Sequence, residues 1–182
     1  MSKFYDDLQF SHDASDNPIW KEIYGQFFPT AKEVVDYREM GEHQLLGIDR
    51  MIALGNTRAI YIDEKVRRKD YGGDIFLEVW SSEERQTPGW IQKPLYVDYI
   101  AYAVLESGKA YLLPVLQLQE AWIRHGEQWE AKYGTKKAFT NLVYDGGYHS
   151  VGVPVPVDIL FRAIGGCLRC DFKSETEILS HG

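Results

Sequence analysis

The feature that most constrains this chain is residues 45–69, where apolar and charged side chains alternate on both sides of Gly55-Asn56. Successive side chains of a β-strand point to opposite faces, so the alternation predicts two strands, each with an apolar and a polar face. The apolar faces carry Leu46, Ile48, Ile52 and Leu54 in the first strand and Ile60, Ile62 and Val66 in the second. Glu64 also falls on the apolar face, where Arg50 could satisfy it across the pair.

The polar faces carry two carboxylates, Asp49 in the first strand and Asp63 in the second, with Lys65 two residues after Asp63. A three-residue loop sets Asp49 directly opposite Asp63, because cross-strand partners in an antiparallel pair share a face. A two-residue turn would instead pair Asp49 with Ile62 and separate the carboxylates. Gly and Asn suit the left-handed position of a three-residue loop, so we expect that loop or a bulge.

Two facing carboxylates with a nearby lysine suit the hydrolysis of a phosphodiester. Carboxylate oxygens hold Mg²⁺, the metal stabilises charge on the phosphorus oxygens, and a cationic side chain positions or deprotonates the attacking water. The alternative is a solvated surface hairpin with a cross-strand ion pair, because so short a motif also matches by chance.

The order of elements resembles the PD-(D/E)xK nuclease superfamily, with Gly47-Ile48-Asp49 in one strand, a hairpin, and Asp63-Glu64-Lys65 in the next. Three later segments, 88–91, 97–100 and 111–114, look like landmarks of its phage and bacterial members. The resemblance covers roughly residues 20 to 164. Ile48 stands where the superfamily has its proline, and Asp63 stands where glutamate is commoner.

The resemblance implies a restriction-endonuclease-like α/β fold, a mixed central β-sheet flanked by helices, and cleavage of DNA that depends on Mg²⁺ or Mn²⁺. It implies catalytic roles for Asp49, Asp63 and Lys65, and a metal held by Asp49, Asp63 and the backbone carbonyl of Glu64. Many members carry a glutamate in the first helix, for which Glu22 is the equivalent, although an ordinary surface glutamate is the alternative. Gln44 resembles a residue near this strand that could orient a water or a base edge, or it simply enters the strand.

The charge balance bears on the DNA partner. A net charge of −7 provides no global basic field, so a DNA enzyme of this charge needs a locally positive groove. Arg67, Arg68 and Lys69 form a short basic run after the lysine, with a solvated face as the alternative reading. A homodimer would supply two sites for the two strands of a duplex. The competing hypothesis is a non-catalytic binding or assembly module that uses the hairpin only structurally.

The length of 182 residues and an apolar fraction of 45% predict one domain with a substantial core. We expect a flexible arm over residues 1–16, a nuclease-like domain over 17–164 and a tail over 165–182. The tail holds Cys167 and Cys170 in a single C-x-x-C. Zinc would need two more ligands, for which His149 and His181 are the nearby candidates, and a tail without metal is the favoured reading. No signal peptide or bilayer-length apolar run is evident, so we expect a cytoplasmic protein without a membrane partner.

The remaining elements follow from periodicity and from turn residues. Residues 30–35 fit either a helix start or a strand. The pattern predicts helices from Asn17-Pro18 to Phe28, over 96–105, over 116–129 and over 157–164, and strands over 74–80, 110–115, 138–144 and 148–155.

Overall fold

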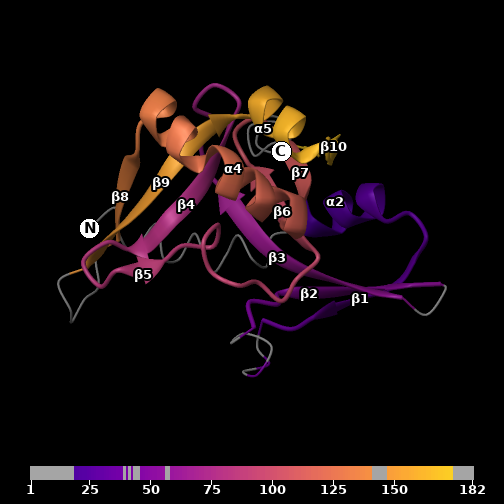
Figure 1. Cartoon of the computed structure of the whole chain (residues 1–182). Coiled ribbons are helices and arrows are strands. Elements are labelled where there is room, and N and C mark those ends of the chain that lie inside the picture. The colour runs from indigo at the N-terminus through magenta and orange to yellow at the C-terminus, as the bar shows by residue number, and fades with distance from the viewer. Residues whose placement is uncertain are drawn as a thin grey trace, which may run out of the picture. The chain divides into compact units, whose positions relative to one another are not determined.

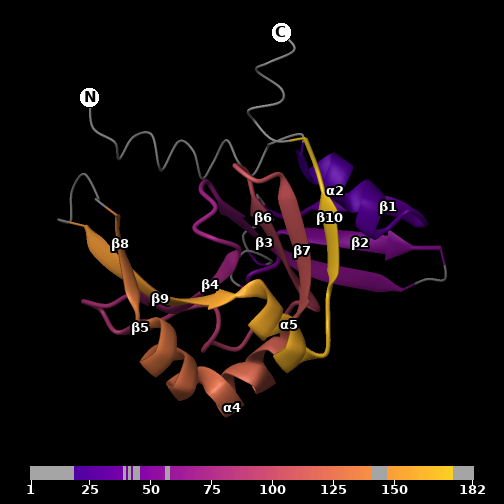
Figure 2. The same cartoon turned by 90° about the horizontal axis from the view of Figure 1, so that it is seen from above.

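The computed structural model describes residues 19–38, 40, 42, 46–55, 58–140 and 147–173. These residues form an α/β structure, as the sequence predicts, with three helices and two β-sheets (Figures 1 and 2). They divide into two compact units. The six-stranded unit takes the described residues of 8–70, 95–115 and 167–182, and the four-stranded unit takes those of 71–94 and 116–166. The expectation of one central sheet is therefore corrected, because the described strands form two.

The six-stranded unit is built on a mixed sheet. Its strand order is β1-β2-β3-β6-β7-β10, and β3 and β6 are parallel while every other neighbouring pair is antiparallel. The strands are β1 (Ala31–Asp36), β2 (Arg50–Leu54), β3 (Ala59–Arg67), β6 (Tyr99–Val104), β7 (Lys109–Pro114) and β10 (Leu168–Asp171).

Helix α2 (Ile19–Phe27) covers the core of this unit. Ile19, Ile23 and Phe27 recur at helical spacing and are buried, which gives the helix one apolar face. That face packs with Ile52 and Ile62 of the sheet in one core cluster. The helix ends before Pro29, as expected from the missing proline N–H.

The hairpin differs from the prediction at its first strand. β2 begins at Arg50, whereas the alternation predicted a strand from Leu46. Gly47 has a φ of +72°, a left-handed conformation that ends any extended run, and Leu46 is 40% exposed. The undecided residues 30–35 belong to β1, which pairs with β2 as an edge strand.

The predicted helix over 96–105 is wrong, because residues 99–104 form strand β6 at the centre of the sheet. Every residue from Ile100 to Val104 is buried, so both faces of the strand are covered. A strand buried on both faces is apolar throughout and loses the alternation of period two. The pattern of Tyr99 with Ala103 and Ile100 with Val104 then imitates helical spacing.

The segment after Gly165-Gly166 is not only a tail. Residues 168–171 form β10 and pair antiparallel with β7, and Phe172 is buried in the core cluster. Both cysteines are free thiols. Burial raises the pKa of Cys167 to about 12 and that of Cys170 to about 11, so neither is an activated nucleophile.

The four-stranded unit has the strand order β5-β4-β9-β8 and two helices. Its elements are β4 (Asp74–Ser82), β5 (Thr87–Pro88), α4 (Val115–Tyr133, of which Val115 is grouped with the other unit), β8 (Lys136–Thr140), β9 (Tyr148–Pro156) and α5 (Val157–Ile164). Gly152 allows close packing, because a Cβ there would lie 2.5 Å from the Phe76 ring. Ile123 of α4 is 83% exposed.

No helix among the described residues is both long enough and apolar enough to cross a bilayer. The expected arm over 1–16 lies outside the residues that the structure describes.

Candidate metal and phosphodiester site

Asp49 is held by backbone hydrogen bonds just before β2. Its N–H donates to the carbonyl of Ile62 in β3 at 2.9 Å, and its carbonyl accepts from the N–H of Tyr37 at 2.9 Å. The preceding residue, Ile48, is buried and Gly47 supplies the left-handed turn. Because the hydrogen bonds to Ile62 and Tyr37 fix the backbone of Asp49, its side chain projects from a defined position beside β3.

The register of the hairpin is that of the three-residue loop. Arg50 pairs with Ile62 and Ala53 with Ala59, and the N–H of Leu54 donates to the carbonyl of Arg58 at 2.8 Å. The two-residue turn, which would have separated the acids onto opposite faces, is therefore excluded. β2 begins one residue after Asp49, so beyond Ile62 the edge of β3 that faces β2 is open to the Asp49 side chain.

The Asp49 carboxylate uses this open edge. Its Oδ2 accepts a hydrogen bond from the backbone N–H of Glu64 at 2.7 Å. The N–H and C=O groups of alternate residues point to the same edge of a strand, so the Glu64 carbonyl points to the edge where Ile62 meets Asp49. A carboxylate oxygen and a backbone carbonyl thus face the same gap in the ladder.

Asp63 and Lys65 complete the group on β3. Asp63 is one of the few buried charged residues described, at 5% exposure. Its Oδ1 lies 2.5 Å from the ammonium Nζ of Lys65, whose side chain is 32% exposed. Lys65 therefore contacts a buried carboxylate while its own side chain remains partly exposed to solvent on the same face of the strand.

The two carboxyl groups interact directly. Burial raises the pKa of Asp49 to about 7, and the negative charge of Asp63 and a hydrogen bond between the two side chains act in the same direction. The Glu64 N–H and the Lys65 ammonium lower that pKa but do not offset the increase. When Asp49 is ionised, the group therefore has more negative charge than its neighbouring cation and amide neutralise.

This excess of negative charge fits a divalent cation. Asp49, Asp63 and the Glu64 carbonyl supply oxygen ligands, which Mg²⁺ and Mn²⁺ prefer. A cation between the carboxylates would offset the burial and the repulsion that together raise the pKa of Asp49. The donor set and the charge imbalance both suit the implied metal.

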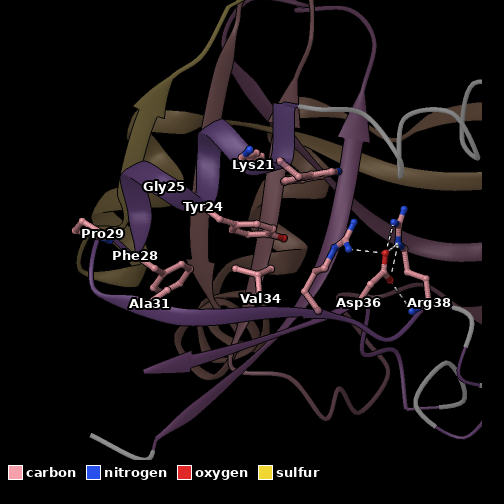
Figure 3. Close-up of a pocket in the computed structure, with 11 residues that line it drawn as sticks. Lys21, Tyr24, Gly25, Phe28, Pro29, Ala31, Val34, Asp36 and Arg38 are labelled. Atoms are coloured by element: carbon pink, nitrogen blue, oxygen red, sulfur yellow. Dashed lines mark hydrogen bonds and ion pairs between the residues drawn. The ribbon is translucent and has the colours of Figure 1, made fainter. Parts of the chain in front are cut away.

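Glu64 points to the other face of β3, toward α2. Its Oε1 accepts from the Tyr24 hydroxyl at 2.6 Å and from Arg50 Nε at 2.8 Å, which confirms the expected contact with Arg50. Arg50 also contacts Asp36 at 2.5 Å, and Asp36 in turn pairs with Arg38. These side chains border a groove of about 590 Å³ between α2 and β1 (Figure 3).

The electrostatics of this second face are governed by burial. Burial raises the pKa of Glu64 while Arg50 and Tyr24 lower it, and burial together with Glu64 raises the pKa of Tyr24 well above its usual value. Hydrogen bonds from Arg38 lower the pKa of Asp36 to about 2. The contacts of Tyr24 and Asp36 were missed from the sequence. Only the need of a buried tyrosine hydroxyl for a partner could have indicated the first.

The other predicted site residues are not all brought to this group. Glu22 is exposed on α2 and close enough to Cys170 of β10 to raise the pKa of that thiol. No described interaction joins Glu22 to Asp49 or Asp63. Gln44 lies outside the described residues. Arg67 ends β3 half-buried, and Arg68 and Lys69 follow it exposed, so this run continues from the strand that carries Lys65.

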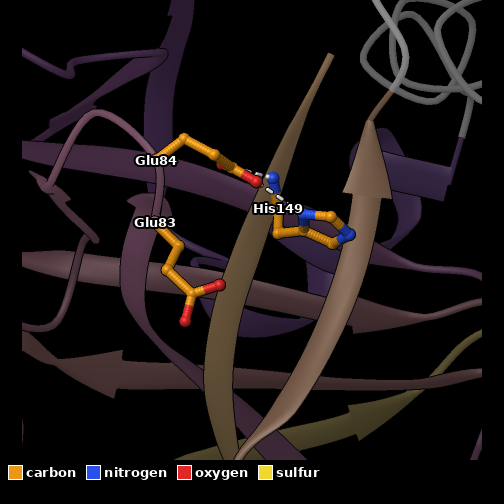
Figure 4. Close-up of side chains that lie close together, drawn as sticks. All are labelled: Glu83, Glu84 and His149. Atoms are coloured by element: carbon orange, nitrogen blue, oxygen red, sulfur yellow. Dashed lines mark hydrogen bonds and ion pairs between the residues drawn. The ribbon is translucent and has the colours of Figure 1, made fainter. Parts of the chain in front are cut away.

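A second cluster of metal-ligand side chains lies in the four-stranded unit. Ligand atoms of Glu83, Glu84 and His149 lie within 4.8 Å of one another (Figure 4). Each carboxylate is already paired, Glu83 with Lys137 at 2.5 Å and Glu84 with the His149 ring at 2.5 Å. Hydrogen bonds from His149 lower the pKa of Glu84 to about 2. Both glutamates are exposed, and each already has a side-chain partner.

No protein-family model, curated protein or solved structure matches this chain. The functional argument therefore depends on the geometry of the site and on the motif residues themselves.

Proposed function

We propose that this protein is a metal-dependent nuclease that hydrolyses phosphodiester bonds of DNA at Asp49, Asp63 and Lys65. The observation that carries the proposal is the meeting of two interacting carboxylates, one of them buried, with a lysine ammonium and an open strand edge. The charge excess of the two acids has a direct use if a divalent cation binds between them.

The chain's own groups have distinct roles in this proposal. Asp49, Asp63 and the Glu64 carbonyl would hold Mg²⁺, or Mn²⁺ in its place. The metal supplies Lewis-acid stabilisation of the charge that develops on the phosphoryl oxygens. Lys65, whose half-exposed ammonium is fixed by Asp63, orients the attacking water and stabilises the same negative charge.

The reaction adds a water oxygen to phosphorus and breaks one P–O ester bond, leaving one phosphate monoester and one hydroxyl group. The water loses a proton to solvent or a neighbouring base, and the departing oxygen gains one. The finer fold assignment, restriction-endonuclease-like, belongs to the proposal as well. It is supported by the order of Asp49 directly before a short strand, a hairpin and the Asp63-Glu64-Lys65 strand in a mixed sheet.

DNA as the substrate is supported by the resemblance of the motif and by the basic run that follows Lys65. Arg67 shares the face of Lys65 on β3, and Arg68 and Lys69 continue it into solvent. Because phosphate contacts dominate nucleic-acid affinity, these side chains are the expected backbone contacts near the site. A homodimer would present two such sites to a duplex.

The test is cleavage by the purified full-length chain. Supercoiled plasmid, linear duplex and single-stranded oligonucleotides are incubated with Mg²⁺, with Mn²⁺ and with EDTA. We expect cleavage of at least one substrate with metal, none with EDTA, and none by Lys65→Ala of unchanged thermal stability. Equal cleavage by wild type and Lys65→Ala would contradict the proposal, as would a wild-type protein that binds metal and DNA without cleaving.

A further inference from the structure

Glu64 connects the two faces of β3. Its backbone N–H donates to Asp49 on the site side, at 2.7 Å, while its side chain is 3% exposed on the α2 side. The backbone of Glu64, whose N–H anchors one metal acid and whose carbonyl is the third proposed ligand, is therefore attached to a buried carboxylate. Contacts that fix the Glu64 carboxylate therefore also fix the backbone groups that Glu64 contributes to the site.

One oxygen of Glu64 takes both of its contacts. Oε1 accepts from the Tyr24 hydroxyl and from Arg50 Nε, whereas Oε2 is buried without a partner among the described residues. A buried carboxylate with a single engaged oxygen depends strongly on each donor, since losing one leaves charge uncompensated. Tyr24 and Arg50 approach from different elements, α2 and β2, so together they restrain the side chain in two directions.

The restraint extends away from the site. Arg50, 13% exposed, is itself fixed by Asp36 of β1, and Asp36 is fixed by Arg38. Arg50, Asp36 and Arg38 are among the residues that line the groove in Figure 3. Three elements that carry no proposed metal ligand thus act on the backbone of one residue, Glu64, that does.

We propose that Tyr24 and Arg50 are positioning residues that hold the backbone of Glu64, and through its N–H Asp49, in the geometry that binds the metal. The predicted effect on metal affinity rests on the proposed function. The restraint of Glu64 by Tyr24 and Arg50 does not. Loss of partners that orient a metal ligand typically weakens metal affinity or activity by 10- to 100-fold.

The closing experiment removes one hydroxyl. Tyr24→Phe keeps the buried ring and deletes its hydrogen bond to Glu64. The matched control is Tyr99→Phe, a tyrosine packed against the same core cluster. Two quantities are measured: the hydrogen exchange and proton shift of the Glu64 amide by ¹⁵N NMR without metal, and the Mn²⁺ concentration that half-saturates the protein.

In Tyr24→Phe we expect the Glu64 amide to exchange about tenfold faster and its proton resonance to move upfield. The reason is that the Glu64 carboxylate loses its hydrogen bond from the Tyr24 hydroxyl and no longer restrains the backbone. The Mn²⁺ midpoint should rise about 10- to 100-fold. Tyr99→Phe should change neither quantity. Glu64→Gln keeps a side-chain oxygen that can accept both hydrogen bonds but loses the charge. It should shift the amide exchange and the Mn²⁺ midpoint in the same direction, and it replaces Tyr24→Phe in the test if that variant does not fold.

An unchanged Glu64 amide and Mn²⁺ midpoint in a folded Tyr24→Phe protein would overturn the inference, even if its melting temperature falls, because the hydroxyl would then serve stability alone. A wild-type protein that binds no Mn²⁺ would overturn the proposed function instead. The amide measurement would still decide whether Tyr24 restrains Glu64.

Discussion

Two acidic clusters of this protein differ in burial and in charge balance. In the six-stranded unit, Asp63 is buried and acts on Asp49, whose pKa rises to about 7. In the four-stranded unit, Glu83 is paired with Lys137 and Glu84 with His149 at the surface, and hydrogen bonds from His149 lower the pKa of Glu84 to about 2. Both clusters have the ligand types of a metal site.

The difference shows that proximity of acids is a poor criterion for a site. At the surface, solvent and neighbouring cations balance the carboxylates at little cost, and such pairs contribute little to stability. In the interior, burial and the neighbouring Asp63 carboxylate raise the pKa of Asp49, a cost that a folded chain keeps where the group has a use. The predictions below compare the two clusters, beginning with the largest expected effect.

The largest expected effect is on cleavage. Asp63→Asn keeps the size of the side chain and removes one negative charge from the proposed metal ligands. Metal-dependent cleavage should then fall by about a hundredfold or more, because the metal supplies several kcal/mol of transition-state stabilisation. Glu84→Gln is the matched acid-to-amide change in the other cluster and should keep the wild-type rate. Initial rates on the best substrate measure both. Equal losses in the two variants would remove the distinction between the clusters.

The next effect is on stability. Arg50→Met leaves the buried Glu64 without its cation, and breaking such a pair costs about 3 kcal/mol or more of unfolding free energy. Lys137→Met breaks an exposed pair with Glu83 and should cost less than about 1 kcal/mol. Urea unfolding followed by tryptophan fluorescence compares the two variants. A larger loss for Lys137→Met than for Arg50→Met would show that the burial argument is wrong.

The smallest effect concerns pH in the exposed cluster. Because the folded-state pKa of Glu84 is depressed to about 2 from 4.5, its contribution is present above pH 4.5 and is lost as the pH falls toward 2. Glu84→Gln should therefore lower stability slightly at pH 6 and by less at pH 3. Unfolding curves of both proteins at the two pH values measure this. A larger difference at pH 3 would contradict the sign.

The hairpin shows what local sequence can predict. The alternation around Gly55 and the preference for a three-residue loop were sufficient to predict the register of the hairpin. The contact of Arg50 with Glu64 was predicted because both side chains lie on the same face of the paired strands. These features depend on residues close together in the chain. The start of β2 could not be obtained in this way, because a glycine such as Gly47 does not reveal its left-handed conformation from sequence.

Long-range features were predicted less well. β6 is buried on both faces and lacks the alternation that distinguishes a strand, and β10 is a four-residue strand whose pairing with β7 has no local signal. The contact of Tyr24 with Glu64 was not predicted, since it arises from packing a helix against a sheet. Glu22, assigned by analogy with the first helix, faces another part of the unit.

The most direct test of the central claim is the stoichiometry of Mn²⁺ binding, measured by isothermal titration of the wild type, Asp63→Asn and Glu84→Gln. The account predicts binding at Asp49 and Asp63 that is lost in Asp63→Asn and kept in Glu84→Gln, with a matching metal-dependent rise in melting temperature for wild type and Glu84→Gln alone. Binding that persists in Asp63→Asn and disappears in Glu84→Gln would contradict it.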